Sequence, residues 1–127
     1  MHWKWSFMII LEDLSLPCPM NRLWSPKHYK IVKSKEGGAK EKRMVEEIRQ
    51  KLGGFPEPIT VACTVSITWW PWSLKKQADV DAYVKSTLDA LTKARVYLDD
   101  ALVDSFTCER MTYTKPRGKL TVTVSEL

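Results

Sequence analysis

The chain has 127 residues and a mass of 14.7 kDa, the size of one domain, and we expect a single domain over residues 1–127. Hydrophobic residues make up 44% of it and charged residues 28%, a composition that excludes an intrinsically disordered protein. No run of 18 apolar residues predicts a membrane span. The net charge of +5 favours a polyanionic partner such as nucleic acid.

The spacing of the cysteines and the start of the chain bear on the cellular compartment of the protein. Cys18, Cys63 and Cys108 are far apart, and no CxxC pair occurs, which argues against a disulfide framework and against a zinc knuckle. The apolar residues at the N-terminus are followed by Glu12 and Asp13 and not by small residues, so we expect no signal peptide. Both features favour a cytoplasmic location.

The first half of the chain predicts a strand, a basic arm and a helix. Alternating apolar residues predict the strand over residues 3–11, and a proline-rich connection follows at 16–19. The basic arm, residues 21–43, has eight Lys and Arg against two Glu. Residues 39–52 predict a helix that ends at Gly53, with an apolar stripe of Met44, Val45, Ile48 and Leu52.

The second half predicts a strand, a helix and two further strands. Apolar and polar residues alternate over residues 59–69, the clearest strand of the chain. Residues 79–94 predict a helix with Asp79 as its N-cap and with a buried stripe of Val80, Val84, Leu88 and Leu91. Residues 102–113 and 119–126 predict a strand pair joined as a hairpin. The element order predicts an α+β fold in which a mixed β-sheet packs with two helices.

Acidic residues gather around the second predicted helix. Asp79 and Asp81 stand at its start, and Asp99 and Asp100 follow its end. A helix of this length would put the two pairs about 20 Å apart, unless the next strand doubles back along the helix. Carboxylates that converge need a cation, and their hard oxygen atoms select Mg²⁺ or Mn²⁺. Such a site activates water for phosphodiester cleavage.

A lysine accompanies these acids. Lys85 is four residues after Asp81, on the same face of the predicted helix, where it could offset charge on a phosphate. The simpler interpretations are an ordinary surface ion pair for the lysine, an N-cap for the first acid and a polar turn for the last two. Asp89 is expected on the solvent side. The basic arm and the basic loop residues Lys75 and Lys76 favour nucleic-acid chemistry over these simpler interpretations.

Short motifs follow one another in the C-terminal half, residues 78–126: DVD at 79–81, a lysine at 85, DAL at 89–91, LDD at 98–100 and TK at 114–115. This stretch resembles the C-terminal half of the RusA-type Holliday junction resolvases, which carry DxDN, a lysine, DAL and DD, followed by a hairpin that contains TK. The opening strand and the LPCPMNRLW segment at 16–24 are also similar to the start of that family.

The resemblance implies a RusA-like fold and a homodimeric, Mg²⁺-dependent crossover junction endodeoxyribonuclease, with Mn²⁺ as a substitute ion. Such an enzyme cuts four-way DNA junctions with paired symmetric nicks in recombination and repair. Family genes often belong to phages or prophages, which implies the cytoplasm of a bacterium or of an infected host cell. By position, the three required acids, which bind the metal, match Asp79, Asp81 and Asp100, and the catalytic lysine matches Lys85. Asp99 matches a less critical acid.

Residue-level arguments also favour a homodimer. One set of three aspartates can cut one strand, whereas resolving a junction requires two nicks, and two-fold pairing supplies the second site. Trp3, Trp5 and Phe7 in the first predicted strand provide apolar surface for pairing.

Six side chains are candidates for DNA contact: Arg22, Trp72, Lys75, Lys76, Lys115 and Arg117. The first belongs to the basic arm, the next three to the loop over residues 70–77, and the last two to the tip of the predicted hairpin. An exposed tryptophan can stack on a base, and the cations can contact phosphates. A solvated turn is the simpler interpretation of the hairpin tip.

The sequence also departs from the family pattern. Ala82 stands where the family usually has Asn, Met20 precedes Asn21 in a shortened proline-rich turn, and Lys75 and Lys76 replace a run of arginines. Two other functions therefore stay open. One is a catalytically impaired protein that binds junctions or other DNA, and the other is a metal-dependent nucleotide phosphohydrolase that uses the same acids.

Overall fold

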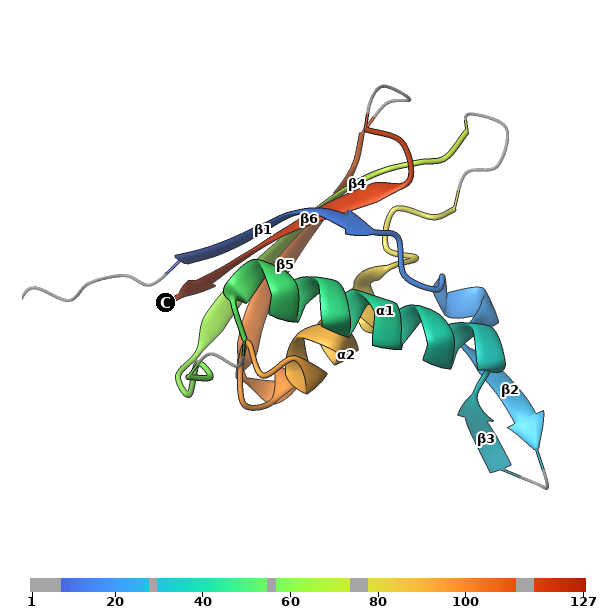
Figure 1. Ribbon diagram of the computed structural model, residues 1–127, viewed down its shortest axis with the longest axis horizontal. Coiled ribbons are helices and arrows are strands. Elements are labelled where there is room, and N and C mark those ends of the chain that lie inside the picture. Colours follow the sequence, from blue (N-terminus) through green and yellow to red (C-terminus); the bar gives the residue numbers. More distant parts are fainter. Residues whose placement is uncertain (1–7, 28–29, 55–56, 74–77, 112–115) are drawn as a thin grey trace, which may run out of the picture.

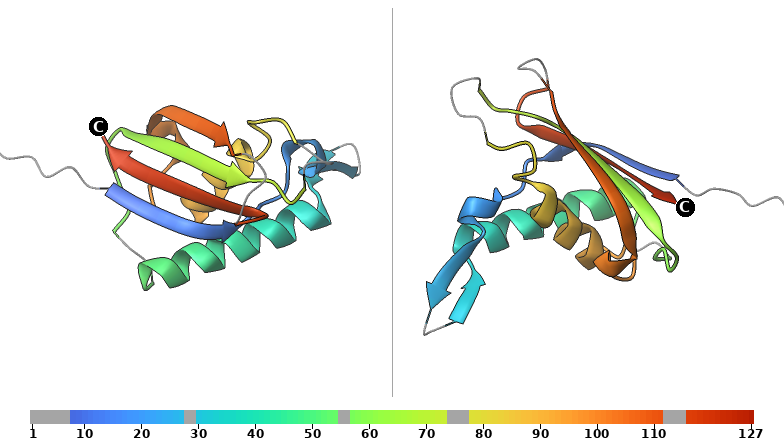
Figure 2. Two further views of the ribbon diagram at one scale, coloured as in Figure 1. Left: turned by 90° about the horizontal axis from the view of Figure 1, so that it is seen from above. Right: turned by 180° about the vertical axis from the view of Figure 1, so that it is seen from behind.

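The computed structural model describes residues 8–27, 30–54, 57–73, 78–111 and 116–127. A four-stranded mixed sheet forms one layer, and two helices cover one of its faces (Figures 1 and 2). The predicted α+β class is therefore confirmed. The elements in chain order are β1 (Met8–Ser15), η1 (Met20–Arg22), β2 (Trp24–Lys27), β3 (Lys30–Lys33), α1 (Lys35–Leu52), β4 (Cys63–Trp70), α2 (Val84–Lys93), η2 (Asp100–Leu102), β5 (Val103–Arg110) and β6 (Lys119–Glu126).

The strands of the sheet stand in the order β1-β6-β4-β5. β4 runs parallel to β5 and antiparallel to β6, so that Ile67 pairs with Cys108 on one side and with Val122 on the other. The predicted hairpin of the last two strands is therefore wrong. The parallel β4–β5 pair needs a crossover, which contains α2, and β6 then takes the opposite side of β4.

Alternation predicted the faces of the strands well. Ile9 and Leu11 of β1 are buried, whereas Met8 and Ile10 are exposed, and residues 3–7 of that predicted strand lie outside the described part of the chain. In β4 the buried positions are Cys63, Val65, Ile67 and Trp69. The strand begins four residues later than expected, and Val61, assigned to the buried face, is 46% exposed.

The first helix begins earlier than predicted, at Lys35. Ser34 is its N-cap and accepts a hydrogen bond from the N–H of Gly37 (2.9 Å). Glycine destabilises the interior of a helix relative to alanine. At position 37, however, a Cβ would lie 2.8 Å from the carbonyl oxygen of Leu23, so only glycine fits this contact. The helix ends as predicted at Gly53, which has φ of 74°. Before it, part of the basic arm forms the β2–β3 hairpin, which the sequence did not predict.

The second helix begins later than predicted, at Val84, because the residues before it form a turn. The N–H of Ala82 donates to the carbonyl of Asp79 (2.9 Å), and the N–H of Val84 donates to that of Asp81 (3.1 Å). Asp79 is therefore not the N-cap, a position that Tyr83 occupies without a side-chain hydrogen bond. Val80 is 46% exposed and does not belong to the buried stripe.

The core lies between the sheet and the two helices. Met44 and Ile48 of α1 and Ala90 and Leu91 of α2 pack there against the inner face of the strands. All three cysteines are free, as expected. In the part of the chain that the structure describes, no helix is long and apolar enough to cross a membrane.

Candidate active site

Asp79 and Asp81 lie in the turn that leads into α2, residues 78–83, which we call the acid turn. Both residues are exposed, and neither forms an ion pair with another described residue. The acid turn also contacts the proline-rich segment, because the N–H of Met20 in η1 donates to the carbonyl of Ala82 (2.9 Å). The segment after the proline-rich connection and the acid turn, which are far apart in the sequence, therefore lie side by side.

Three side chains from β4 and β5 fix the backbone of the acid turn. Trp69 Nε1 and Cys108 Sγ both donate to the carbonyl of Val80, each at 2.9 Å. Arg110 Nη1 donates to the carbonyl of Ala78 at 2.8 Å. The peptide group before Asp79 and the peptide group before Asp81 are thus held by side chains of the sheet, while both aspartates are exposed.

The contact of Cys108 with the acid turn also affects its thiol. Burial raises the pKa of Cys108 and outweighs the lowering by a hydrogen bond with Trp69, and the negative charge of Asp81 adds the smallest contribution, which also raises the pKa. The thiol is therefore protonated at neutral pH and can donate to the backbone.

Lys85 lies in the first turn of α2 and pairs with two acids. Its Nζ is 3.1 Å from Asp89 Oδ1 and 4.0 Å from Asp100 Oδ2. The hydrogen bond with Asp89 raises the pKa of Lys85, burial lowers it less, and the charges of both acids raise it further. The spacing of four residues predicted a pair between Lys85 and Asp81, and this prediction is wrong. Asp81 precedes the helix, so the i,i+4 geometry does not apply to it.

Further ion pairs extend from Asp89 into α1. Asp89 Oδ2 is 3.6 Å from Lys33 Nζ of β3, and Lys33 and Lys93 both bind the carboxylate of Glu41, which is 6% exposed. Burial raises the pKa of Glu41, but the hydrogen bonds and charges of the two lysines outweigh it and lower the pKa below its ordinary value. Neither Lys33 nor Glu41 was predicted from the sequence to belong to the site. We call this series the ion-pair chain: Lys93, Glu41, Lys33, Asp89, Lys85 and Asp100.

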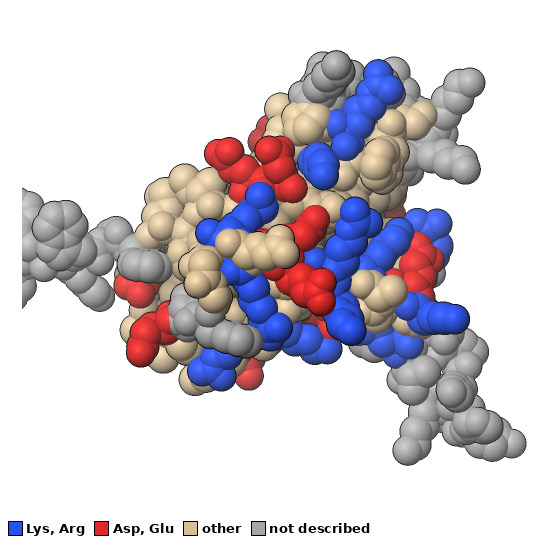
Figure 3. Space-filling view, viewed as in Figure 1, with Lys and Arg blue, Asp and Glu red and all other residues tan. Residues whose placement is uncertain are grey.

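The chain does double back after α2. Asp99 is the N-cap of η2 and accepts from the N–H of Ala101 (2.8 Å), which leaves Asp100 facing Lys85. Asp89 is not on the solvent side, since its side chain is only 17% exposed. A cavity of about 310 Å³ opens beside these groups and is lined by Lys33, Asp89, Thr92, Lys93, Asp99 and Asp100. On the face of the molecule drawn in Figure 3, blue and red side chains interleave.

The structure does not gather the three candidate metal ligands into one group. Among the described residues, no set of three or more His, Cys, Asp or Glu side chains could hold a metal ion. Asp79 and Asp81 lie in the acid turn beside Cys108, whereas Asp100 pairs with Lys85. The carboxylates have the hard oxygen atoms that Mg²⁺ prefers, but their arrangement does not match a three-ligand site.

The described candidates for DNA contact come from three segments of the chain. Arg22 in η1 has a side chain that is 58% exposed, with its Nε 3.8 Å from Glu36 Oε1. Trp72 is 67% exposed, and Arg117 is exposed in the turn that leads into β6. The remaining candidates, Lys75, Lys76 and Lys115, lie outside the described residues.

Comparison with known proteins agrees with the motifs. The family model of the endodeoxyribonuclease RusA matches residues 17–125. A crossover junction endodeoxyribonuclease RusA of Escherichia coli O139:H28 (strain E24377A / ETEC) is 47% identical over 49 residues, which are 39% of this chain and 40% of the relative. The aligned segment thus spans less than half of that relative. Because the family model covers most of the chain, the protein belongs to the RusA endodeoxyribonuclease family.

Proposed function

We propose that this protein is a structure-specific endodeoxyribonuclease that resolves four-way DNA junctions by paired symmetric nicks in recombination and repair. The observation that carries the proposal is the family match over residues 17–125, a range that contains every candidate site residue. The similar protein from Escherichia coli is named a crossover junction endodeoxyribonuclease. The free cysteines suit action in a reducing cytoplasm, of a bacterium or of a phage-infected cell.

In this proposal Asp79, Asp81 and Asp100 are the catalytic acids. Lys85 offsets the charge that develops on the phosphate, and its ammonium group stays protonated because Asp89 holds it. The support for these roles is the fixed backbone of the acid turn and the contact between Lys85 and Asp100.

We include Mg²⁺ in the proposal, with Mn²⁺ as a substitute, because the catalytic acids are hard oxygen donors. The arrangement of the three carboxylates described above does not supply a common ligand set. Titration of Mn²⁺ into the protein, and into Asp79→Asn and Asp100→Asn, determines which carboxylates hold an ion.

In this proposal the DNA is bound by Arg22, Trp72 and Arg117, together with Lys75, Lys76 and Lys115. We also propose a homodimer, since two nicks require two sites. Met8 and Ile10 on the edge strand β1 are 60% and 56% exposed and provide apolar surface for pairing. Light scattering at micromolar concentration tests the dimer, and a monomer that resolves junctions would contradict it.

The experiment that tests the function uses a labelled four-way junction, a linear duplex of the same sequence and free nucleotides. We expect cleavage of the junction with Mg²⁺, little cleavage of the duplex and no hydrolysis of nucleotides. Tight binding without cleavage in Mg²⁺ or Mn²⁺ would instead favour the impaired DNA-binding protein. That alternative is motivated by Ala82, whose methyl group packs against the core where the family usually has an amide. Hydrolysis of nucleotides with intact junctions would favour the phosphohydrolase.

A further inference from the structure

The side chain of Trp72 is largely exposed to solvent, although it is large and aromatic. Trp72 follows the end of β4 by two residues and is 67% exposed, more than any other large apolar residue in the described part of the chain. Trp69, three residues earlier, is 1% exposed and holds the acid turn through its indole N–H. Trp72 thus stands near the end of β4 at which the acid turn is fixed.

The indole ring of Trp72 lies on a glycine. A Cβ on Gly118 would be 2.3 Å from Cε2 and 2.5 Å from Cδ2 and Cζ2 of the ring. Three adjacent ring atoms at nearly equal distances place the glycine over the face of the indole and not against its edge. No side chain can replace this contact, and the φ of +63° at Gly118 also favours glycine.

Backbone hydrogen bonds hold the glycine in place. The N–H of Gly118 donates to the carbonyls of Trp70 (3.0 Å) and Pro71 (3.4 Å), and its own carbonyl accepts from the N–H of Leu16 (3.4 Å). The turn before β6 is therefore attached both to the end of β4 and to the segment after β1. One face of the indole is seated on a fixed backbone, which limits the side-chain entropy that the protein loses when a ligand binds to the other face.

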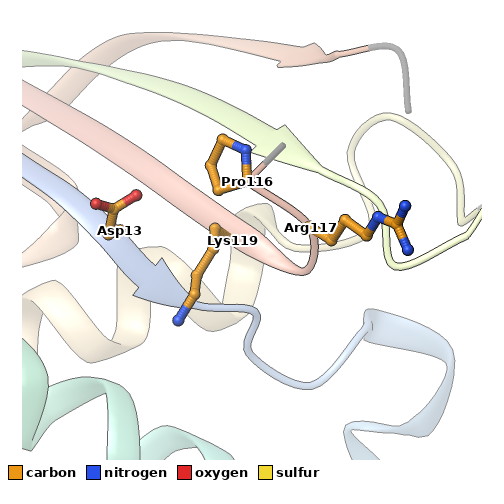
Figure 4. Close-up of a pocket in the computed structure, with 4 residues that line it drawn as sticks. All are labelled: Asp13, Pro116, Arg117 and Lys119. Atoms are coloured by element: carbon orange, nitrogen blue, oxygen red, sulfur yellow. The ribbon is translucent and has the colours of Figure 1, made fainter. Parts of the chain in front are cut away.

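This turn carries two cationic side chains. Arg117 and Lys119 flank Gly118, and together with Asp13 and Pro116 they line a cavity of about 770 Å³ (Figure 4). The guanidinium of Arg117 extends toward the segment that follows β4, while Lys119 points to the opposite side of the strand (Figure 4). A flat aromatic face next to cations is the combination that binds single-stranded nucleic acid, because bases stack on the ring and phosphates meet the cations.

We propose that Trp72, seated on Gly118, is a stacking platform for an unpaired nucleobase. This inference rests on the proposed function only in taking DNA as the ligand. It adds that the protein prefers bases that are not paired in a duplex. A second copy of this chain is the other occupant that an exposed indole could meet, and the test below distinguishes it.

The test measures binding to a single-stranded oligonucleotide that contains one 2-aminopurine and to the same strand in a fully paired duplex. Stacking on the indole quenches 2-aminopurine, so we expect the wild-type protein to quench the single strand. Trp72→Ala should remove the quenching and weaken single-strand binding about 5- to 100-fold, with little effect on the duplex. Trp72→Phe should retain most of the affinity. The matched control is Phe106→Ala, since Phe106 of β5 is also aromatic and 51% exposed, and it should bind like the wild type.

Equal binding by Trp72→Ala and the wild type would overturn the platform, as would equal losses on single strand and duplex. A fall of the molar mass of Trp72→Ala in light scattering would overturn it in favour of a contact between copies. If the wild type cleaves junctions while Trp72→Ala binds normally, only the platform fails, whereas a wild type that binds no DNA contradicts the proposed function itself. Gly118→Ala, checked for folding by circular dichroism, should lose quenching although Trp72 is present.

Discussion

The acid turn and the ion-pair chain place acidic residues near α2 by opposite means. In the acid turn, two neutral donors and one arginine of the sheet hold the backbone, and the carboxylates of Asp79 and Asp81 are left exposed without an ion pair to a described residue. In the ion-pair chain the side chains hold one another, and Asp100 faces a lysine. Substitutions in the first region should therefore change chemistry alone, whereas those in the second should also move neighbouring groups.

The largest effect is expected for Asp79→Asn, Asp81→Asn and Asp100→Asn, each of which should lower junction cleavage at least about a hundredfold. Binding of the junction should be unchanged or tighter, because each variant removes a negative charge and phosphate affinity comes from the cations. For the two residues of the acid turn, the free energy of unfolding should stay within about 0.5 kcal/mol of wild type. Cleavage rates under single-turnover conditions and gel-shift affinities check this, and near-normal cleavage by any variant removes that residue from the site.

Glu41→Gln should give the largest loss of stability, about 2–3 kcal/mol, because it leaves Lys33 and Lys93 without their shared carboxylate. The folded-state pKa of Glu41 is lowered, so its contribution is present above the unfolded pKa of about 4.3 and is lost as the pH falls below it. Urea unfolding at pH 7 and at acidic pH should show a smaller difference between the two proteins at acidic pH. The control is Glu46→Gln, an exposed position of the same helix, which should match the wild type at both pH values.

Asp89→Asn should have an intermediate effect on activity, about tenfold, because Lys85 loses the partner that positions it. The pKa of Lys85 is raised mainly by Asp89, so its removal lowers that pKa, and the alkaline limb of the pH–rate profile should move to lower pH. Asp89→Glu should restore part of the rate and of the profile. An unchanged pH profile in a folded Asp89→Asn protein would show that the pair has no part in cleavage.

Asp99→Asn is expected to be the mildest change. Asn caps helices about as well as Asp, so the hydrogen bond to the N–H of Ala101 should persist and stability should change by less than about 0.5 kcal/mol. Cleavage should stay within a few-fold of wild type. Complete loss of cleavage by a folded Asp99→Asn protein would mean that Asp99, and not Asp100, is the required acid of that pair.

The sequence predicted features that depend on local patterns, and it did not predict contacts between distant segments. Alternation identified the buried residues of β4 because side-chain period alone decides the face of a strand. Val80 was assigned to a helix on its spacing from Val84, but its carbonyl accepts from Trp69 and Cys108, contacts that no local pattern reveals.

Long-range placement was less predictable still. Pro116 and Gly118 are a genuine turn signal, yet a turn does not say which strand lies beside the next one, and β4 intervenes between β5 and β6. Within the ion-pair chain, Lys85 and Asp89 are four residues apart and have a local signature, whereas Glu41 and Lys93 are 52 positions apart and have none. The candidate acids and Lys85 were found through motif spacing, and the groups that hold them became visible only in the fold.

Mapping the nicks on a four-way junction tests the central claim most directly. Each of the four strands is labelled in turn, and the junction is incubated with the protein and Mg²⁺, with Asp79→Asn as the control. The account predicts a pair of nicks at symmetric positions in two opposed strands, which disappear with Asp79→Asn although the junction is still bound. Nicks scattered over all four strands, equal cutting of a linear duplex, or an intact junction under saturating binding would contradict it.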